Sequence, residues 1–401
     1  EKYPTLNPMT TDGATPITYA GEEAEIAAAS TIDVDFSDYK APVIKKENED
    51  VTVYTSDTTE EKYLIAENKD GATGTVSRVE KANANNTDYS VTYQEHVKKF
   101  DGDYSKNTLK DVYDGKISLE QFVSGLSLYE LANLVNGHSS DKTVQGVAGA
   151  TWKNDEKGFV PVNLSDGPAG LRIAPECGVC TTAWPCATLL AYTWNPNLVE
   201  QVGAAGAEEV KENNIAVWLT PAVNIHRNPL CGRNFEYYSE DPLLAGKMAA
   251  GMVRGIQSQH IGASVKHFAA NNKETNRKHS DSRVSERALR EIYLKQFEII
   301  VKESDPWTIM SSYNVINGHR ASENKELLED ILRGEWGFQG MVTTDWWTRG
   351  EHYKEIKAGN DVKMATGYPE RVKKAMELGE ITRADLEHCA RRVLELILKI
   401  D

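Results

Sequence analysis

The sequence lacks any apolar run that approaches the ~18–20 residues a helix needs to cross a bilayer. It also lacks an excess of positive charge, because 60 acidic residues stand against 45 basic ones and give a net charge of −15. Nucleic acids and anionic membrane surfaces are bound through basic patches. We therefore expect neither as a partner, whereas an uncharged small molecule such as a sugar is compatible with this composition.

Cysteine is scarce and its number is odd, which is a poor basis for a disulfide framework in a chain of this length. The five are Cys177, Cys180, Cys186, Cys231 and Cys389. Cys177 and Cys180 have the spacing of a metal or redox pair, but no second pair accompanies them, so zinc is the weaker alternative to reduced thiols. Reduced thiols favour a cytoplasmic location. The chain begins with Glu1 and has no secretory signal, so we expect its start to be trimmed or internal.

Large aliphatic residues are sparse between residues 1 and 115, where Thr, Asn, Asp, Glu, Lys and Ala dominate. Short strand-like pieces occur at Val51–Thr55 and Tyr89–Tyr93. We expect this segment to be an extension or linker that wraps another domain, the tail of a missing upstream half. A second domain then covers residues 116–401, and Ser118 with Gln121 predicts a capped helix that continues to Val135.

From there, apolar strand-like runs alternate with amphipathic helical runs, which predicts a mostly parallel sheet covered by helices. The strands are expected at Val160–Leu164, Ile215–Thr220, Ile261–Val265, Thr308–Ser312, Met341–Thr344 and Asp361–Met364. The helices are expected at Leu198–Asn213, Leu243–His260, Glu286–Glu303, Lys325–Trp336, Glu370–Leu378 and Arg383–Ile400. This pattern indicates an α/β fold of the (β/α)8 TIM-like barrel type, with two strands degraded or placed before Val160.

Polar residues of a particular kind follow these strands. Asp166 follows the first strand, Lys266 and His267 the third, and Asp345 the fifth. Further polar residues in the same positions are Asn224, His226, Arg227, Arg233, Tyr313, Asn314, Trp346 and Trp347. In a (β/α) barrel all these strand ends open onto one face, where active sites form. Polar loops follow strands in any protein, but loops that carry charges, His, Tyr and Trp after five strands favour a common pocket.

Such a pocket suits a sugar. Charged side chains make strong hydrogen bonds to hydroxyl groups, and an indole face covers the apolar face of a pyranose ring. We find no glycine-rich phosphate loop and no metal-ligand spacing, so no cofactor or metal is expected. Retaining glycoside hydrolysis requires a carboxylate nucleophile and a carboxylic acid that donates a proton. Asp345 is the best candidate nucleophile, because it ends a strand beside tryptophan; the proton donor is not evident.

Several long motifs occur in order along the chain: Leu164–Arg172, Asn224–Glu236, Ser239–Pro242, Lys266–Arg277, Met310–Asn314 and Val342–Trp346. Together they resemble the motifs of glycoside hydrolase family 3, and of its β-glucosidases in particular. The resemblance covers residues 116–401 and implies an exo-acting retaining β-glycosidase that releases terminal non-reducing β-D-glucosyl residues. It implies that Asp345 forms the covalent glycosyl intermediate. It also implies that the terminal sugar is bound by Asp166, Arg233, Lys266, His267, Arg277, Tyr313 and Trp346.

The sequence departs from the usual family layout at its end. Most members continue past the barrel into an α/β sandwich that donates the acid/base glutamate, whereas this chain stops at Asp401. The Asp111–Ser118 run-in resembles a subgroup with the sandwich before the barrel, which would make that sandwich a missing partner. Within the chain, Glu274 and His279 are the weak candidates for the proton donor, because a donor must first reach the leaving oxygen.

Two other readings remain open. Lys266 ends a strand where a barrel lyase would keep a Schiff-base lysine, and Arg233 with Arg277 would then bind a carboxylate or phosphate of the substrate. Alternatively, the barrel is a subunit that binds sugar but turns over little by itself.

Overall fold

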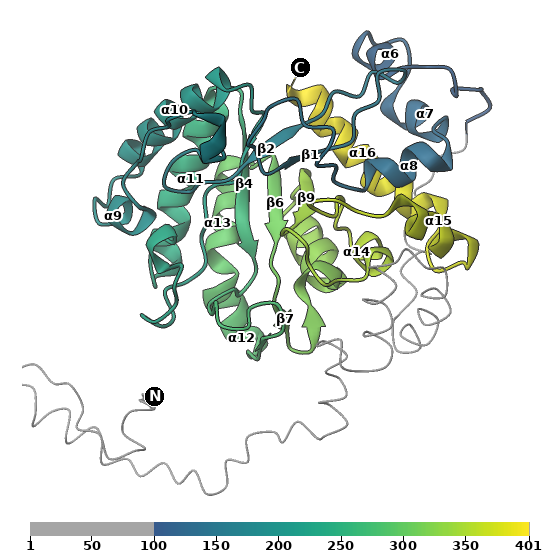
Figure 1. The fold of residues 1–401 in the computed structure, drawn as a ribbon. Coiled ribbons are helices and arrows are strands. Elements are labelled where there is room, and N and C mark those ends of the chain that lie inside the picture. Colours follow the sequence, from purple (N-terminus) through teal and green to yellow (C-terminus); the bar gives the residue numbers. More distant parts are fainter. Residues whose placement is uncertain (1–99, 401) are drawn as a thin grey trace, which may run out of the picture. The chain divides into compact units, whose positions relative to one another are not determined.

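The structure is a computed structural model that describes residues 100–400 (Figure 1). The predicted strands Val51–Thr55 and Tyr89–Tyr93 lie outside the described residues. The same holds for most of the predicted linker, so the division at residue 116 stays a prediction.

One curled sheet organises the fold. Its strands are β1 (Gly149–Ala150), β2 (Asn163–Ser165), β3 (Val217–Trp218), β4 (Gly262–Phe268), β6 (Thr308–Ser311) and β9 (Met341–Thr344), in the order β1-β2-β3-β4-β6-β9. All neighbours from β2 onward are parallel, and β1 alone runs antiparallel to β2. Every residue of β4, β6 and β9 is buried. This is the expected environment of parallel strands covered on both faces.

Isolated bridges connect the last strand back to the first. Thr343 of β9 pairs in parallel with Val362, and the next residue, Lys363, pairs in parallel with Asn136. His138 then pairs antiparallel with Ala150 of β1. The barrel-like α/β fold predicted from the sequence is therefore confirmed. The predicted strand Asp361–Met364 is present only as such a bridging segment, and the two positions missing from the sequence pattern are β1 and the segment around residues 136–138.

The predicted helices agree closely with the structure. They are α10 (Pro196–Glu212), α11 (Pro242–Ser258), α12 (Glu286–Ala288) continued by a π-helical turn η5 (Leu289–Tyr293) and α13 (Lys295–Ser304), the π-helix η7 (Glu326–Glu335), α15 (Pro369–Glu377) and α16 (Arg383–Ile400). Asn195 and Asp241 cap α10 and α11 by accepting from backbone N–H groups. Each cap precedes a proline at the first helical position, a combination that fixes where a helix begins.

The single helix expected from residue 119 to Val135 is wrong. The structure has two helices there, α7 (Leu119–Ser124) and α8 (Leu128–Leu134), and both begin with a capping box. Ser127 and Glu130 form the second box, with the Glu130 carboxylate accepting from the Ser127 N–H at 2.6 Å. A new helix start of this kind ends the preceding helix at Gly125.

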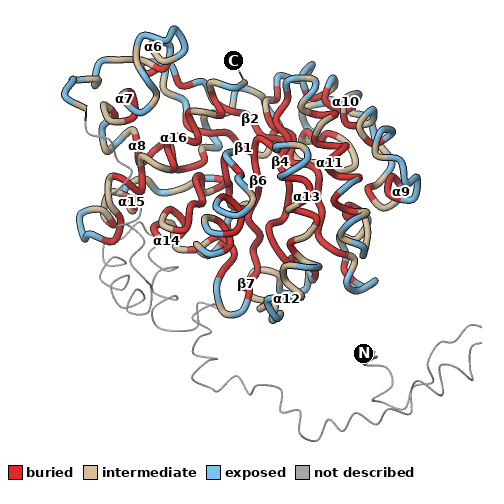
Figure 2. Tube along the Cα trace, turned by 180° about the vertical axis from the view of Figure 1, so that it is seen from behind, coloured by how far each residue is buried: buried red, intermediate tan, exposed pale blue. Residues whose placement is uncertain are grey.

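Helices flank the sheet on two sides, and shorter elements complete the fold. α10, α11 and α13 pack on one another on one side, and α16 packs with α7 and α8 on the other (Figure 1). Figure 2 shows that buried residues follow the strands and the inner sides of α11 and α13. The shorter elements are α6 (Leu109–Tyr113), η3 (Pro175–Cys177), α9 (Ala187–Ala191), η4 (Asn234–Glu236), η6 (Ala321–Glu323), α14 (His352–Lys357), and a small sheet of β5 (Asp281–Ser282), β7 (Val315–Ile316) and β8 (His319–Arg320).

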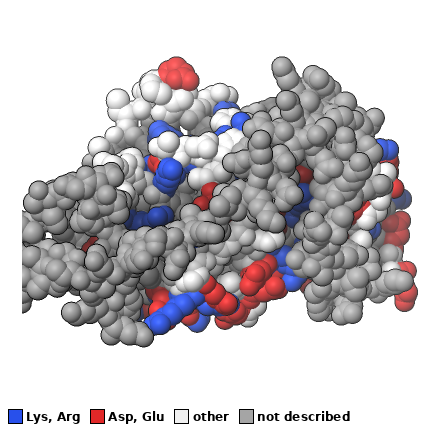
Figure 3. Space-filling view, turned by 90° about the horizontal axis from the view of Figure 1, so that it is seen from below, with Lys and Arg blue, Asp and Glu red and all other residues white. Residues whose placement is uncertain are grey.

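The described surface carries charges of both signs. In the view from below, acidic and basic side chains lie next to one another along the lower edge of the visible described surface (Figure 3). Between residues 100 and 400, no helix is both long and apolar enough to span a membrane.

Candidate active site

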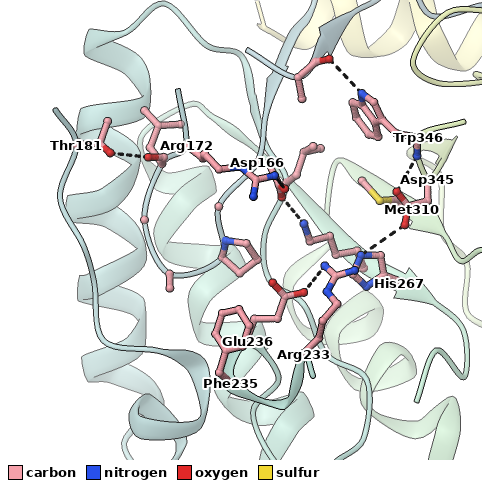
Figure 4. A pocket seen from close by; sticks show the side chains of 18 of the residues that line it. Asp166, Arg172, Thr181, Arg233, Phe235, Glu236, His267, Met310, Asp345 and Trp346 are labelled. Atoms are coloured by element: carbon pink, nitrogen blue, oxygen red, sulfur yellow. Dashed lines mark hydrogen bonds and ion pairs between the residues drawn. The ribbon is translucent and has the colours of Figure 1, made fainter. Parts of the chain in front are cut away.

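The carboxyl ends of the parallel strands open into one pocket of about 760 Å³. All eight site residues predicted from the sequence line it: Asp166, Arg233, Lys266, His267, Arg277, Tyr313, Asp345 and Trp346. They come from loops or strand ends up to 180 residues apart in the chain, which the parallel sheet brings to one edge (Figure 4). The common pocket inferred from the strand ends is thus present in the structure.

Asp345 directly follows β9 and is 8% exposed. Its Oδ1 accepts from the Trp346 N–H at 2.7 Å, and its Oδ2 lies 3.8 Å from His267 Nε2. Burial raises the pKa of Asp345 above its usual value, although the Trp346 N–H and the charge of Lys266 act in the opposite direction. The carboxylate is held in place but not neutralised by a close cation, so it keeps an oxygen available for chemistry.

Asp166, after β2, lies in a different environment from Asp345. Its Oδ1 accepts from Lys266 Nζ at 2.5 Å, and its Oδ2 forms an ion pair with Arg172 (Figure 4). Burial opposes ionisation here, but Lys266 and Arg172 outweigh it and hold the pKa of Asp166 well below its usual range. Asp166 is therefore a permanent acceptor, suited to a sugar hydroxyl and unsuited to donating a proton.

His267 is fully enclosed, and its main chain is fixed by Asn224. The Asn224 side chain donates to the His267 carbonyl and accepts from the His267 N–H, both at 3.0 Å. Burial, followed by the charges of Arg233 and Lys266, lowers the pKa of His267 far below its usual value. The imidazole is therefore neutral, with one donor and one acceptor nitrogen for hydrogen bonding.

The remaining predicted residues form the far wall of the pocket. Arg233 is paired with Glu236 on η4, and the Arg277 guanidinium lies 4.6 Å from the centre of the Tyr313 ring. The Tyr313 hydroxyl donates to the Trp346 carbonyl at 2.6 Å. The Trp346 indole N–H donates to the Ala148 carbonyl at 3.1 Å, which fixes the ring at the pocket wall. The wall is thus preorganised by contacts among its own residues.

Some polar residues that follow strands support the pocket without lining it. His226 lies within 3.0 Å of the carbonyls of Asn234 and Tyr237, and so holds the loop that carries Arg233. Asn314 donates to the Ala269 carbonyl at 3.2 Å. For the part of the chain that the structure describes, Asn224, His226, Arg227 and Asn314 are not among the lining residues. The sequence pattern found the correct loops but did not separate their supporting residues from their lining residues.

Sequence reasoning missed two charged lining residues whose motifs it had nevertheless noticed. Arg172 closes the Leu164–Arg172 motif, and its N–H donates to the Asp166 carbonyl at 2.8 Å. Glu236 closes the Asn224–Glu236 motif. Trp347, which the strand-end pattern had included in the expected pocket, also lines it. The charged residue at the end of each motif could have indicated Arg172 and Glu236 as lining residues. The Arg172 side chain forms an ion pair with Asp166, the aspartate at the start of the same loop.

The cysteines and the candidate proton donors are not among the described residues that line the pocket. All five cysteines are free, with Cys177 half-buried and Cys180 exposed, and no group of three or more metal-binding side chains occurs among the described residues. Glu274 accepts from Arg277 and Asn271, both at 3.1 Å. Neither Glu274 nor His279 is among the described residues that line the pocket.

Comparisons with known proteins agree with this geometry. The profile of the glycosyl hydrolase family 3 N terminal domain matches residues 168–396. Beta-glucosidase A of Butyrivibrio fibrisolvens is 58% identical over 279 residues, which cover 69% of this chain and 33% of the relative. Exo-alpha-(1->6)-L-arabinopyranosidase of Bifidobacterium longum is 45% identical over 287 residues, which cover 69% and 37%. The chain therefore spans about a third of the length of these curated relatives.

A solved structure shows the same arrangement of the chain. Beta-glucosidase 3B from Thermotoga neapolitana, in complex with α-D-glucose, aligns with a TM-score of 0.67 and 44% identity. The alignment covers 71% of this chain and 43% of that one.

Proposed function

Because the chain belongs to glycosyl hydrolase family 3, we propose that its pocket is the nucleophile side of an exo-acting retaining β-glucosidase, with Asp345 as the nucleophile. The observation that carries the proposal is the setting of Asp345. It is a buried carboxylate at a strand end, with one oxygen fixed by Trp346 and the other facing a pocket of hydroxyl-binding groups.

The chemistry follows from that setting. An oxygen of the Asp345 carboxylate attacks the anomeric carbon, a C–O ester bond forms, and the leaving oxygen departs with the electron pair of the glycosidic bond. Water then hydrolyses the glycosyl-Asp345 ester and regenerates the carboxylate. Lys266 and Arg233 place positive charge near Asp345, which keeps its ionised form available despite burial.

The other lining residues are proposed to bind the terminal sugar. Asp166 accepts hydrogen bonds from hydroxyl groups, and Arg233, Lys266, His267 and Arg277 supply donors around the same ring. The Tyr313 hydroxyl donates to the Trp346 carbonyl and is therefore an acceptor for the sugar. Trp346 covers its apolar face. A terminal β-D-glucosyl residue is the substrate we propose. Support comes from the 58% identical relative, a β-glucosidase, and from the glucose complex of the Thermotoga neapolitana enzyme.

The pocket requires a proton donor from elsewhere. Besides Asp345, the carboxylates among its described lining residues are Asp166 and Glu236, and both are held in ion pairs with basic residues. A carboxylate fixed by a cation is a poor proton donor. We propose that an α/β sandwich domain of a longer protein supplies the acid/base glutamate. From the Asp111–Ser118 run-in alone, we propose that this domain precedes the barrel.

A mechanism-based label tests the nucleophile and the missing acid together. The 2,4-dinitrophenyl 2-fluoro glucoside has a leaving group that needs no proton, so this chain should form a stable ester at Asp345, detected by peptide mass spectrometry. Cellobiose needs a protonated leaving group and should be cleaved slowly, because general acid catalysis contributes roughly 100- to 10,000-fold. A label on another residue would refute the nucleophile. Rapid cellobiose hydrolysis would place an acid within these residues, with Glu274 and His279 as the first positions to mutate.

The alternatives are distinguished by simple measurements. A Schiff-base lyase needs a Lys266 amine that is free to attack a carbonyl, whereas Lys266 Nζ donates to Asp166 Oδ1 at 2.5 Å. Borohydride trapping at Lys266 would favour the lyase. A sugar-binding subunit would bind glucose in a calorimeter without forming the ester at Asp345.

We also propose a cytoplasmic location, supported by the free cysteines, including exposed Cys180. Cell fractionation of the source organism with an antibody against this chain tests it.

A further inference from the structure

Two adjacent tryptophans line the pocket in different ways. Trp346 is half-buried and its indole N–H is bonded to the Ala148 carbonyl. Trp347 lines the same pocket but is 65% exposed. An exposed aromatic ring at a pocket is an unsatisfied apolar surface that a ligand can cover. The position of Trp347 is therefore at the mouth of the pocket, outside the polar groups that surround Asp345.

The backbone of Trp347 is held in an uncommon conformation. Its φ is 53°, in the left-handed region that bulky residues rarely adopt unless their surroundings impose it. Its N–H donates to the Met364 carbonyl at 2.9 Å, and its carbonyl accepts from Lys278 Nζ at 3.2 Å. The Lys278 ammonium also lies 4.9 Å from the centre of the Tyr313 ring, which itself lines the pocket.

These contacts connect the mouth to the wall of the site. Tyr313 donates to the Trp346 carbonyl and Lys278 to the Trp347 carbonyl, so two neighbouring peptide groups after the nucleophile are fixed by side chains from two other loops. The indole of Trp347 is thus presented to solvent by a constrained backbone. Such preorganisation lowers the entropy cost of binding whatever covers the ring.

We propose that Trp347 is the platform for the leaving-group side of the substrate, and that Lys278 is the positioning residue that holds this platform. The inference rests on the proposed function and concerns its specificity. The buried polar residues around Asp345 enclose the terminal sugar, so the rest of an exo-cleaved substrate must extend outward past the mouth. An aryl group or a second pyranose ring has the flat apolar face that an indole covers.

Two substrates separate the platform from the chemistry, and neither requires a proton donor. 2,4-Dinitrophenyl β-glucoside carries a large aromatic leaving group, whereas β-glucosyl fluoride has a leaving group of one atom. Trp347→Ala should lower kcat/KM for the aryl glucoside about 3- to 10-fold, the range of one aromatic contact. It should leave kcat/KM for the fluoride within about twofold of the parent, because a leaving group of one atom does not cover the indole. The comparison uses kcat/KM because this constant reports the steps up to ester formation. Trp347→Phe should retain most of the activity on the aryl glucoside.

Lys278 is tested by the same pair of substrates. Lys278→Met removes the donor to the Trp347 carbonyl and should reproduce the selective loss on the aryl glucoside. Lys278→Arg keeps a donor and a positive charge and should restore most of it. A general structural role would instead lower activity on both substrates together, without rescue by arginine.

Trp194 offers a matched control. It is 70% exposed with φ 51°, and it is not among the described residues that line the pocket. Trp194→Ala should therefore leave both substrates unaffected. Equal losses on both substrates, or no loss, for Trp347→Ala would overturn the inference. If the parent chain neither turned over the fluoride nor formed the ester at Asp345, the proposed function itself would fail.

Discussion

Two buried aspartates lie beside strand β9, one near each end of the strand, and their surroundings differ. Asp361 is fully buried and pairs with Val342 near the start of the strand. It accepts from the Val342 N–H at 2.7 Å, from Arg333 at 2.8 Å and from Arg392 at 3.0 Å. Asp345 follows the other end of the strand. Among the described residues no Lys or Arg forms a direct ion pair with it, and His267 remains 3.8 Å away.

Asp361 and Asp345 differ in how completely they are paired with cations. Complete pairing suits a buried charge that stabilises the fold, whereas incomplete pairing leaves a carboxylate available for reaction. Around Asp361 the cluster is closed, because Arg392 also pairs with Glu329 at 3.1 Å and every carboxylate in it has a cationic partner. Around Asp345 the positive charges are near enough to favour ionisation but leave an oxygen open to the pocket. Burial is therefore common to both aspartates, and the incomplete pairing of Asp345 is what distinguishes the proposed nucleophile from Asp361.

Asp345→Asn should give the largest change in activity. The amide has nearly the same shape but cannot form the glycosyl ester, so kcat/KM for 2,4-dinitrophenyl β-glucoside should fall on the order of 1,000-fold or more. The melting temperature should stay close to that of the parent, because no close ion pair is lost. Near-parent turnover by the purified variant would show that another residue is the nucleophile.

Asp361→Asn should give the opposite pattern. Removing one partner of a buried pair leaves Arg333 and Arg392 incompletely compensated, which costs about 3–5 kcal/mol in the free energy of unfolding. Urea denaturation followed by circular dichroism measures this loss. At temperatures where the variant is still folded, its kcat/KM should match that of the parent. A stable variant with little activity would mean that the two aspartates are coupled.

The strands and the pocket could be predicted from the sequence to different extents. Apolar runs ending in Asp166, Lys266 and Asp345 predicted both the strands and the pocket, because parallel strands align their carboxyl ends. The segment around residues 136–138 was missed because it pairs only through isolated bridges, and β1 was missed because it has only two residues. Both are too short to show a periodic pattern of apolar residues. Arg172 and Glu236 were missed as pocket residues because their place in the pocket depends on ion pairs within their loops, with Asp166 and Arg233, which the sequence does not show.

Asp166→Ala should have a smaller effect than the first two changes. A hydrogen bond from a sugar hydroxyl to a charged group is worth roughly 1.5–3 kcal/mol, so the affinity for a glucose-like iminosugar should fall about 10- to 100-fold. Lys266 and Arg172 would lose their shared acceptor, but Arg172 is 72% exposed and can be solvated. An unchanged inhibition constant, with unchanged stability as the control, would exclude a direct contact between Asp166 and the sugar.

The smallest expected effect is a separation between two acid transitions. Burial raises the pKa of Asp345 above 3.8, and only the ionised form attacks, so activity should fall on acidification with a midpoint above that value. In the closed cluster, Glu329 is buried, but Arg392 and His388 outweigh burial and lower its pKa below 4.5. A lowered carboxyl pKa contributes stability that is present above 4.5 and is lost only as the pH falls below it. Activity on 2,4-dinitrophenyl β-glucoside should therefore fall with a midpoint above pH 3.8, and it should recover when the pH is raised from values at which the circular dichroism signal is unchanged. Loss of activity and of structure at one common pH would mean that the acid limb reports unfolding and not protonation of Asp345.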